Sequence, residues 1–242
     1  MTSSFLFSTF PYVAVALLIA GTLVRYILAR REPEAMTAQA GEAVAALAGG
    51  KAWCLSLLAL FLLHLAGLVF PRSILSWDSS TARLYLLEGA ALVAGIVALV
   101  GWAAVMWQNL RRTGRSAVTE LSDTVFLALL FIGIFSGLAI AVGERWGSMW
   151  GTITLTPYVL SLFRGNPAPT FIYGLPFLVR LHVFSAFAAL AILPGTRLSS
   201  VLVLGLHRGL ELFGRPFAAA ERMAGDWVRK NNPAGRIWPE ED

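Results

Sequence analysis

The sequence predicts an all-α integral membrane protein, a five-helix transmembrane bundle. Hydrophobic residues make up 57% of the chain and charged residues only 14%, whereas about 25% of the residues in a water-soluble domain are charged. Five apolar stretches approach or exceed the roughly 20 residues that a helix needs to cross a bilayer. They run without the alternation of a membrane β-barrel, which favours helices.

The predicted spans are separated by charged or Gly/Pro-rich connections. They cover residues 12–29, 52–70, 84–107, 125–142 and 172–193. The residues before the first span lack the basic region and the cleavage site of a signal peptide, so we expect this segment to be retained. We expect residues 1–206 to form the membrane domain and residues 207–242 to form a cytoplasmic amphipathic tail, because the latter mix charges with scattered apolar side chains.

The distribution of basic residues predicts the orientation. Most of the 19 Lys and Arg residues fall on one side of the predicted membrane, and the other side has only Arg72, Arg83, Arg145 and Arg164. By the positive-inside rule the N-terminus is outside and the C-terminus is cytoplasmic. The net charge of +5 then reflects topology and contact with membrane lipid. A nucleic-acid partner has no motif to support it.

Two of the three histidines lie inside predicted spans, at similar depth. His64 comes six residues before the outer end of its span and His182 ten residues after the outer end of its own, which is roughly 9 and 15 Å. An ionisable side chain in hydrocarbon is costly and usually has a partner. Two imidazoles at one level predict the axial ligands of a b-type haem; the alternative is that each hydrogen-bonds a neighbouring helix. The single cysteine, Cys54, and the absence of CxxCH exclude covalent haem attachment.

Two arginines accompany this pair. Arg180 precedes His182 by two residues, so it is a candidate to bind a haem propionate; the alternative is that it extends to the outer interface. Arg83 opens the third span, where it either contacts a quinone oxygen or anchors the helix among headgroups. Gly67, Gly89, Gly95 and Gly101 either admit a flat macrocycle or allow close helix packing.

The chain resembles the gamma subunit, or cytochrome b subunit, of membrane-bound respiratory nitrate reductase. The similarity covers most of the sequence and includes HLAGLVFP from His64, SDTVFLALLFIGIFSGL from Ser122 and RLHVFSAFAALAILPGTRL from Arg180. The resemblance implies a five-helix subunit with an outer N-terminus. It also implies quinol oxidation near the outer face and electron transfer through b haems to a cytoplasmic iron–sulfur partner.

The chain departs from this family at one pair of positions. Members with two haems have further histidines ten residues before His64 and eighteen after His182, where this chain has Cys54 and Ser200. The resemblance therefore implies one haem b, the outer one, held by His64 and His182. Cys54 with His207 is a conceivable second ligand pair, but an intramembrane cysteine is usually a small apolar residue.

These observations predict a monohaem cytochrome b subunit that exchanges electrons between quinol or quinone and a redox partner subunit. One outer haem leaves the inner half of a layer of about 30 Å without a relay, so either a partner supplies a cofactor from inside or, as we favour, a partner binds at the outer face. The apolar connection over residues 143–176 is a candidate cover for the quinone pocket or a partner surface. The alternative function is a redox-inactive membrane anchor for assembly of a larger complex.

No catalytic triad, phosphate loop or carboxylate dyad is visible in the sequence. The chain is therefore expected to contribute to an enzyme only as an electron-transfer subunit of a complex. We expect a multi-pass protein of a bacterial or archaeal cell membrane.

Overall fold

The structure, a computed structural model, describes residues 5–47, 51–111, 117–212 and 223. It is all-helical over these residues and contains five helices long and apolar enough to cross a membrane, as the sequence predicts. These candidate spans are Phe5–Ala29, Lys51–Val69, Thr81–Gln108, Leu121–Gly143 and Phe177–Gly195. The protein is a multi-pass membrane protein.

Prolines mark several helix boundaries. The π-helical turn η1 (Phe5–Thr9) leads into α2 (Phe10–Ala29), which has Pro11 in its first turn. Between α4 (Lys51–Val69) and α5 (Pro71–Trp77), Phe70 leaves the helical region with φ −122° and ψ 53°, because a residue before proline is disfavoured in the α conformation. Pro176 immediately precedes α10 (Phe177–Ile192), and Pro194 lies in the 3₁₀ turn η2 (Leu193–Gly195) that follows it.

The predicted boundaries differ from the observed helices most at the starts of the fourth and fifth spans, and by three residues at each end of the third. The third span belongs to α6 (Thr81–Leu110), which begins three residues earlier and ends three residues later than predicted. The fifth is shorter at its start, because residues 170–173 form a separate helix, α9 (Thr170–Tyr173), before the Pro176 break. The fourth lies within α7 (Ala117–Gly143).

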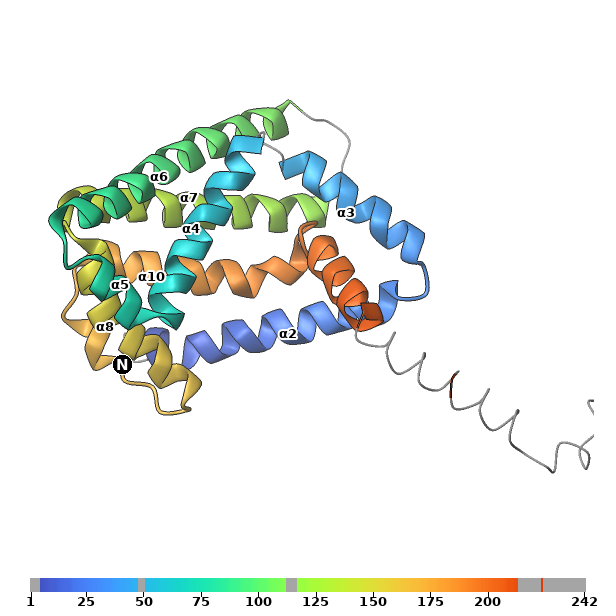
Figure 1. The fold of residues 1–242 in the computed structure, drawn as a ribbon. Helices are drawn as coiled ribbons and strands as arrows, with labels where there is room; N and C mark the ends of the chain where they lie inside the picture. The colour runs from blue at the N-terminus through green and yellow to red at the C-terminus, as the bar shows by residue number, and fades with distance from the viewer. Residues whose placement is uncertain (1–4, 48–50, 112–116, 213–222, 224–242) are drawn as a thin grey trace, which may run out of the picture.

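The spans pack in the order α2, α10, α7, α6, α4, and each one contacts the next. In Figure 1 α2, α10, α7 and α6 follow one another across the bundle, with α4 crossing in front. Glycines allow two of the closest approaches: a Cβ on Gly95 would lie 2.7 Å from Leu138 Cδ2, and one on Gly101 would lie 2.7 Å from Trp53 Cβ. At these two positions the glycines therefore serve helix packing rather than a cofactor.

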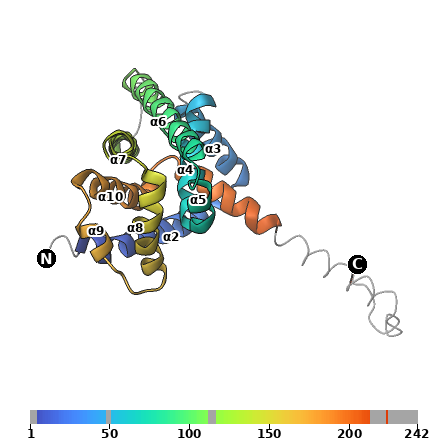
Figure 2. The ribbon, with the colours of Figure 1, turned by 60° about the vertical axis from the view of Figure 1, so that its left-hand side comes forward.

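Short helices cover the two ends of the bundle. One end has α5, α8 (Gly147–Phe163) and α9, and the opposite end has α3 (Pro33–Leu47) and a helix over residues 199–212, as Figures 1 and 2 show. We call these the α8 end and the α3 end. The chain enters its first span at the α8 end.

The connection over residues 143–176, predicted to be too apolar for a solvated loop, contains α8 and α9. Its buried residues Tyr158, Leu162 and Ile172 form a core with Phe7. The Tyr158 hydroxyl donates to the Phe7 carbonyl at 2.9 Å, and burial is the main cause that raises the pKa of this phenol, with smaller effects from Tyr12 and Tyr173. These contacts tie α8 to the start of α2.

Most of the predicted tail lies outside the described residues. Its first part, residues 207–212, continues the helix that begins at residue 199. There His207 Nε2 lies 3.3 Å from Glu211 Oε1, one turn further along.

Candidate functional site

The structure places His64 and His182 at the same depth on different helices. His64 on α4 lies five residues before Val69, and His182 on α10 lies five residues after Phe177. Both are therefore about 8 Å inside the helix ends at the α8 end. The agreement in depth is closer than the sequence boundaries predicted, because α10 begins later.

The two imidazoles form a pair across the bundle. Their ring centroids lie 5.8 Å apart and their planes are inclined by 25°. Two metal–nitrogen bonds of about 2 Å, with about 1 Å from each nitrogen to its ring centre, place two ligating imidazoles ~6 Å apart. The observed separation fits one metal ion between the rings.

The hydrogen bonds of both rings indicate the same tautomer. His64 Nδ1 lies 2.7 Å from the Leu60 carbonyl oxygen, and His182 Nδ1 lies 2.9 Å from that of Gly133. A carbonyl only accepts, so each Nδ1 carries the proton and each Nε2 keeps its lone pair. A metal-ligating histidine commonly has this arrangement, with its other N–H bound to a backbone carbonyl.

His182 is held against α7 by small residues. The Ser136 hydroxyl lies 3.2 Å from Nδ1, and it also donates to the Ile132 carbonyl at 2.5 Å. A Cβ on Gly137 would lie 3.1 Å from His182 Cε1. A side chain at position 137 would therefore require the His182 ring to shift by a few tenths of an ångström.

The donor set indicates which kind of metal group fits. Among the described residues, no three or more His, Cys, Asp or Glu side chains gather into a metal site. A metal bound by this pair would have its other coordination positions free of these side chains, and a haem would fill four of them with ring nitrogens and leave two for the histidines. The histidine pair and its tautomers fit a haem.

The structure places the two predicted arginines differently. Arg180, half a turn before His182, has a buried Nε without a hydrogen-bond partner among the described residues. Such a group requires an acceptor. Arg83 is exposed and directed toward α5: its Nη2 donates to the Ser76 carbonyl at 3.3 Å and the Ser79 hydroxyl at 3.2 Å, and its guanidinium lies 5.5 Å from the Trp77 ring centroid.

A cavity of about 370 Å³ lies beside Arg83. It is lined by Arg72, Ser73, Ser76, Trp77 and Arg83. No described contact joins Arg83 to either histidine.

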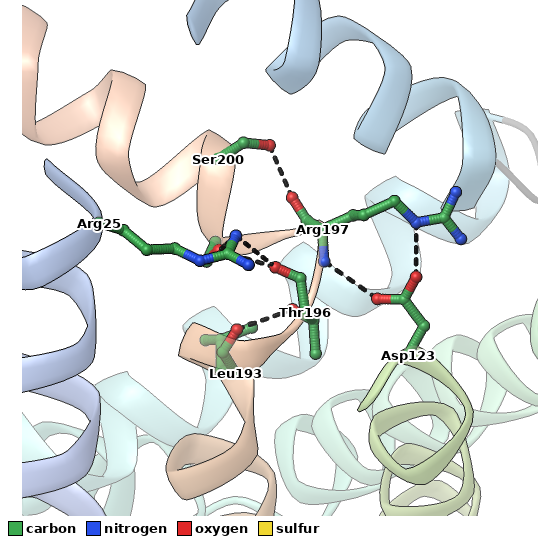
Figure 3. A network of polar contacts seen from close by, with 7 residues as sticks. Arg25, Asp123, Leu193, Thr196, Arg197 and Ser200 are labelled. Atoms are coloured by element: carbon green, nitrogen blue, oxygen red, sulfur yellow. Dashed lines mark hydrogen bonds and ion pairs between the residues drawn. The ribbon is translucent and has the colours of Figure 1, made fainter. Parts of the chain in front are cut away.

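Polar contacts at the α3 end join three helices, as Figure 3 shows. Arg197 donates from its backbone N to Asp123 Oδ1 at 3.0 Å and from Nε to Oδ2 at 2.5 Å. Arg25 on α2 donates to the Thr196 carbonyl at 3.0 Å and to the Ser199 hydroxyl. The Ser200 hydroxyl donates to the Arg197 carbonyl at 2.6 Å. Ser200 thus takes part in a local turn.

The interior near the α3 end is filled by side chains. Trp53, Ala98, Val105 and Leu127 form a buried cluster. The Trp102 indole donates to the Leu127 carbonyl at 2.8 Å. Cys54, next to Trp53, is exposed.

Several residues around the histidine pair were not predicted from the sequence. Gly133, Ser136 and Gly137 contact His182 from α7, and the spacing GIFSG was the available signal. Glu88, the sole acidic residue of the Thr81–Gln108 span, was not considered either; its Oε1 accepts from the backbone N–H and the hydroxyl of Ser148, each at 2.7 Å.

Comparisons with known proteins show what this chain is similar to. The nitrate reductase gamma subunit family matches residues 3–209. The respiratory nitrate reductase 2 gamma chain of Escherichia coli (strain K12) is 22% identical over 201 residues, which cover 81% of this chain and 88% of the relative. The nitrate reductase gamma chain of Bacillus subtilis (strain 168) is 23% identical over 214 residues, which cover 85% and 94%.

Proposed function

This chain belongs to the nitrate reductase gamma subunit family, and we propose that it is a monohaem cytochrome b subunit of a respiratory oxidoreductase. In this proposal His64 and His182 are the axial ligands of one haem b. The subunit exchanges electrons between quinol or quinone in the membrane and a partner redox subunit. The family normally binds haem b and belongs to multi-subunit complexes that oxidise quinol.

One observation supports the ligand assignment above all others. Two histidines from non-adjacent spans lie 5.8 Å apart at one depth, and each binds a backbone carbonyl through Nδ1. A pair of histidines that only joined helices would need no common depth and no common tautomer. When bound, the haem would supply one-electron redox chemistry.

The proposal of a single haem is supported by the residues at the α3 end. The second pair of histidines found in two-haem members is replaced here by Cys54 and Ser200. Ser200 donates to the Arg197 carbonyl, and Trp53 fills the space against Gly101. Replacing these packed side chains by a macrocycle would require the helices to separate.

The orientation follows from the basic residues. Arg25, Arg30 and Arg31 lie at or after the end of α2, Lys51 begins α4, Arg111 follows α6 and Arg197 follows η2, so the α3 end carries these six basic residues. The positive-inside rule then places the α3 end in the cytoplasm and the α8 end outside. The proposed haem lies near the outer face.

The two arginines have different proposed roles. Arg180 binds a haem propionate, because its buried Nε lacks an acceptor among the described residues. Arg83 is a weaker candidate for contact with a quinone oxygen, since its contacts with Ser76, Ser79 and Trp77 equally suit an anchor at the interface.

A partner at the outer face suits this location best. Electron tunnelling weakens exponentially with distance, and a haem about 8 Å below one face of a ~30 Å layer leaves the other half without a relay. A partner that inserts its own cofactor from the cytoplasmic side is the other arrangement. The substrate of the complex belongs to a separate catalytic subunit.

A haem count with matched histidine variants tests the proposal. Purified protein should contain one b-type haem per chain, and both His64→Ala and His182→Ala should abolish its spectrum. His207→Ala is the control, because His207 lies in the helix over residues 199–212 and pairs with Glu211; it should retain the haem. Two haems per chain would contradict the count.

The alternative, a redox-inactive anchor, gives a different result. The purified protein would be colourless, deletion of the chain would release its partners from the membrane, and the histidine variants would behave like wild type. Family membership alone fits both functions, but the paired histidines favour the haem-binding one.

A further inference from the structure

We propose that the α8 end of this protein binds one phospholipid with a net negative headgroup, such as phosphatidylglycerol. Arg72 and Arg83 hold its phosphate, and an apolar groove between α4 and α6 holds one of its acyl chains. This site goes beyond the electron-transfer function and does not depend on a haem. It gives Arg83 the role of an anchor at the membrane interface.

The cavity beside Arg83 has the chemistry of an anion site. It has a volume of about 370 Å³ and is lined by Arg72, Ser73, Ser76, Trp77 and Arg83. No aspartate or glutamate lines it, and Asp78, the one acidic residue between positions 72 and 83, is buried elsewhere. Guanidinium and hydroxyl groups donate hydrogen bonds, and the planar fork of a guanidinium matches the oxygens of a phosphate.

Arg83 is held in position by α5 and keeps donors for a ligand. Its Nη2 binds the Ser76 carbonyl and the Ser79 hydroxyl, and its guanidinium lies 5.5 Å from the Trp77 ring centroid. The Trp77 indole donates in turn to the Arg83 carbonyl at 3.2 Å. Among the described residues, Nη1 and Nε of Arg83 make no hydrogen bond, and Arg72 makes no hydrogen bond or ion pair. Both arginines therefore have N–H groups free for a phosphate.

The cavity lies at the depth of lipid headgroups. Arg83 comes two residues after Thr81, where the third candidate span begins, which is about 3 Å along the helix. Side chains on a helix are directed toward its N-terminus, so Arg83 reaches back to α5, which lies outside the candidate spans. Trp77 is 44% exposed, and tryptophan is enriched at this level of a membrane.

An apolar groove begins on the same face of α6 as Arg83. Leu86, Ala90 and Val97 line this groove. They follow Arg83 by three, seven and fourteen residues, a spacing that keeps side chains on one face of a helix. The groove has a volume of about 540 Å³, and its other lining residues are Leu55, Ser56, Tyr85, Gly89, Val93 and Ala94.

The groove has the length of one lipid leaflet. Tyr85 and Val97 are twelve residues apart, which is about 18 Å along α6, and half of a hydrocarbon core is about 15 Å. The Ser56 hydroxyl in its wall already donates to the Trp53 carbonyl at 2.8 Å. An acyl chain that starts below Arg83 and follows α6 therefore fits the groove along its length.

The two arginines select for the charge of the headgroup. The phosphate of phosphatidylglycerol is its only charged group, whereas phosphatidylcholine carries an ammonium group beside its phosphate. With two guanidinium groups and no carboxylate in the lining, one arginine can bind the phosphate while the other repels that ammonium group. The site should therefore prefer the anionic lipid.

Native mass spectrometry of the full-length protein in detergent tests the headgroup site. Wild type should bind one phosphatidylglycerol per chain more tightly than phosphatidylcholine of the same chain length. Arg72→Gln should weaken this binding by about 5-fold and Arg72→Gln/Arg83→Gln by about 25-fold, the usual contribution of one and two basic residues near an anionic lipid surface. Arg164→Gln is the matched control, because it removes an exposed arginine that follows α8 at the same end, and it should bind like wild type.

A variant that fills the groove separates a lipid from a free anion. Ala90→Phe adds an apolar ring to the groove and changes no charge. It should weaken phosphatidylglycerol binding by about 3-fold or more, because the acyl chain loses its packing contacts. Val100→Phe is the control, since Val100 is exposed on α6 and outside the groove lining, and inorganic phosphate should not displace the lipid.

Several results would overturn the inference. Equal affinity for the two lipids, unchanged binding in Arg72→Gln/Arg83→Gln, or an equal loss in Arg164→Gln would refute the headgroup site. Unchanged binding in Ala90→Phe, or displacement of the lipid by inorganic phosphate, would show a site for free anions only. Lipid binding is measured without reference to haem, so absence of haem would refute the proposed function and leave this inference in place.

Discussion

At the scale of single residues, the two histidines have unequal surroundings. His64 is exposed at the bundle surface and holds one carbonyl within its own helix, that of Leu60. His182 is packed against α7, where Gly133 and Ser136 bind its Nδ1 and Gly137 makes room for the ring. The position of His182 therefore depends on residues that belong to another helix.

The substitution Gly137→Ala should disturb the haem site. A Cβ there would lie 3.1 Å from His182 Cε1 and 3.4 Å from Nδ1, so the ring must move away from the Gly133 carbonyl. We expect lower haem content or an altered haem spectrum in the purified protein. Gly143→Ala, on the same helix with nothing within 4 Å of the new Cβ, is the matched control. Normal haem in Gly137→Ala would show that the ring does not occupy this position.

Tyr158 should make stability sensitive to alkaline pH. Burial raises the pKa of its phenol above the ordinary value, which is about 10. The folded state thus retains a proton that the unfolded chain releases, so this stabilisation is complete below pH ~10 and decreases as the pH rises above it.

Thermal unfolding of detergent-solubilised protein across this pH range measures the effect. At neutral pH the free energy of unfolding of Tyr158→Phe should be lower than that of wild type by about 1 kcal/mol, because the Phe7 carbonyl loses its donor. Above pH ~10 the variant should lose less stability than wild type as the pH rises. Tyr85→Phe, at an exposed tyrosine, should follow the wild-type curve. If the stability of Tyr158→Phe decreased with alkaline pH as much as that of wild type, the decrease would come from other groups.

At the scale of elements, the α3 end is joined by one buried ion pair. Asp123 begins the membrane part of α7 and binds both the backbone and the side chain of Arg197, which follows η2. The Asp123 side chain is 8% exposed and that of Arg197 is 28% exposed. Arg25 connects α2 to the same region through its hydrogen bonds to Thr196 and Ser199. These contacts fix where the chain leaves its last span.

Removing one charge of this pair should destabilise the bundle. Asp123→Asn leaves a partly buried guanidinium without its anion, and we expect a cost of about 3 kcal/mol. Glu211→Gln is the comparison: it breaks the pair with His207, in which Glu211 is 56% exposed, and should cost below about 1 kcal/mol. The midpoint of thermal unfolding compares them, and equal shifts would argue against a structural role for the Asp123 pair.

At the scale of the whole molecule, the proposed haem lies close to one face only. Its ligands are five residues from the helix ends at the α8 end. A membrane-impermeant oxidant should therefore oxidise the reduced haem at least ~10-fold faster in right-side-out vesicles than in inverted ones. Faster oxidation in inverted vesicles would reverse the proposed orientation.

The sequence by itself determined the number of spans, and it predicted that His64 and His182 lie toward the same end of the bundle. A span needs only sufficient apolar length, and depth is a count of residues at a fixed rise. The basic residues also predicted an orientation, which the vesicle experiment tests.

Only the tertiary structure decided which side chains meet across the bundle. Lipid is as apolar as the protein interior, so exposed residues such as Leu58 and Phe61 resemble buried ones such as Val105 and Leu127, and the sequence did not show which face of each helix is inside. The packing of α4, α6, α7, α8 and α10 against one another decided which face of each helix is inside. It placed His64 beside His182, Gly137 against the His182 ring and Glu88 on Ser148.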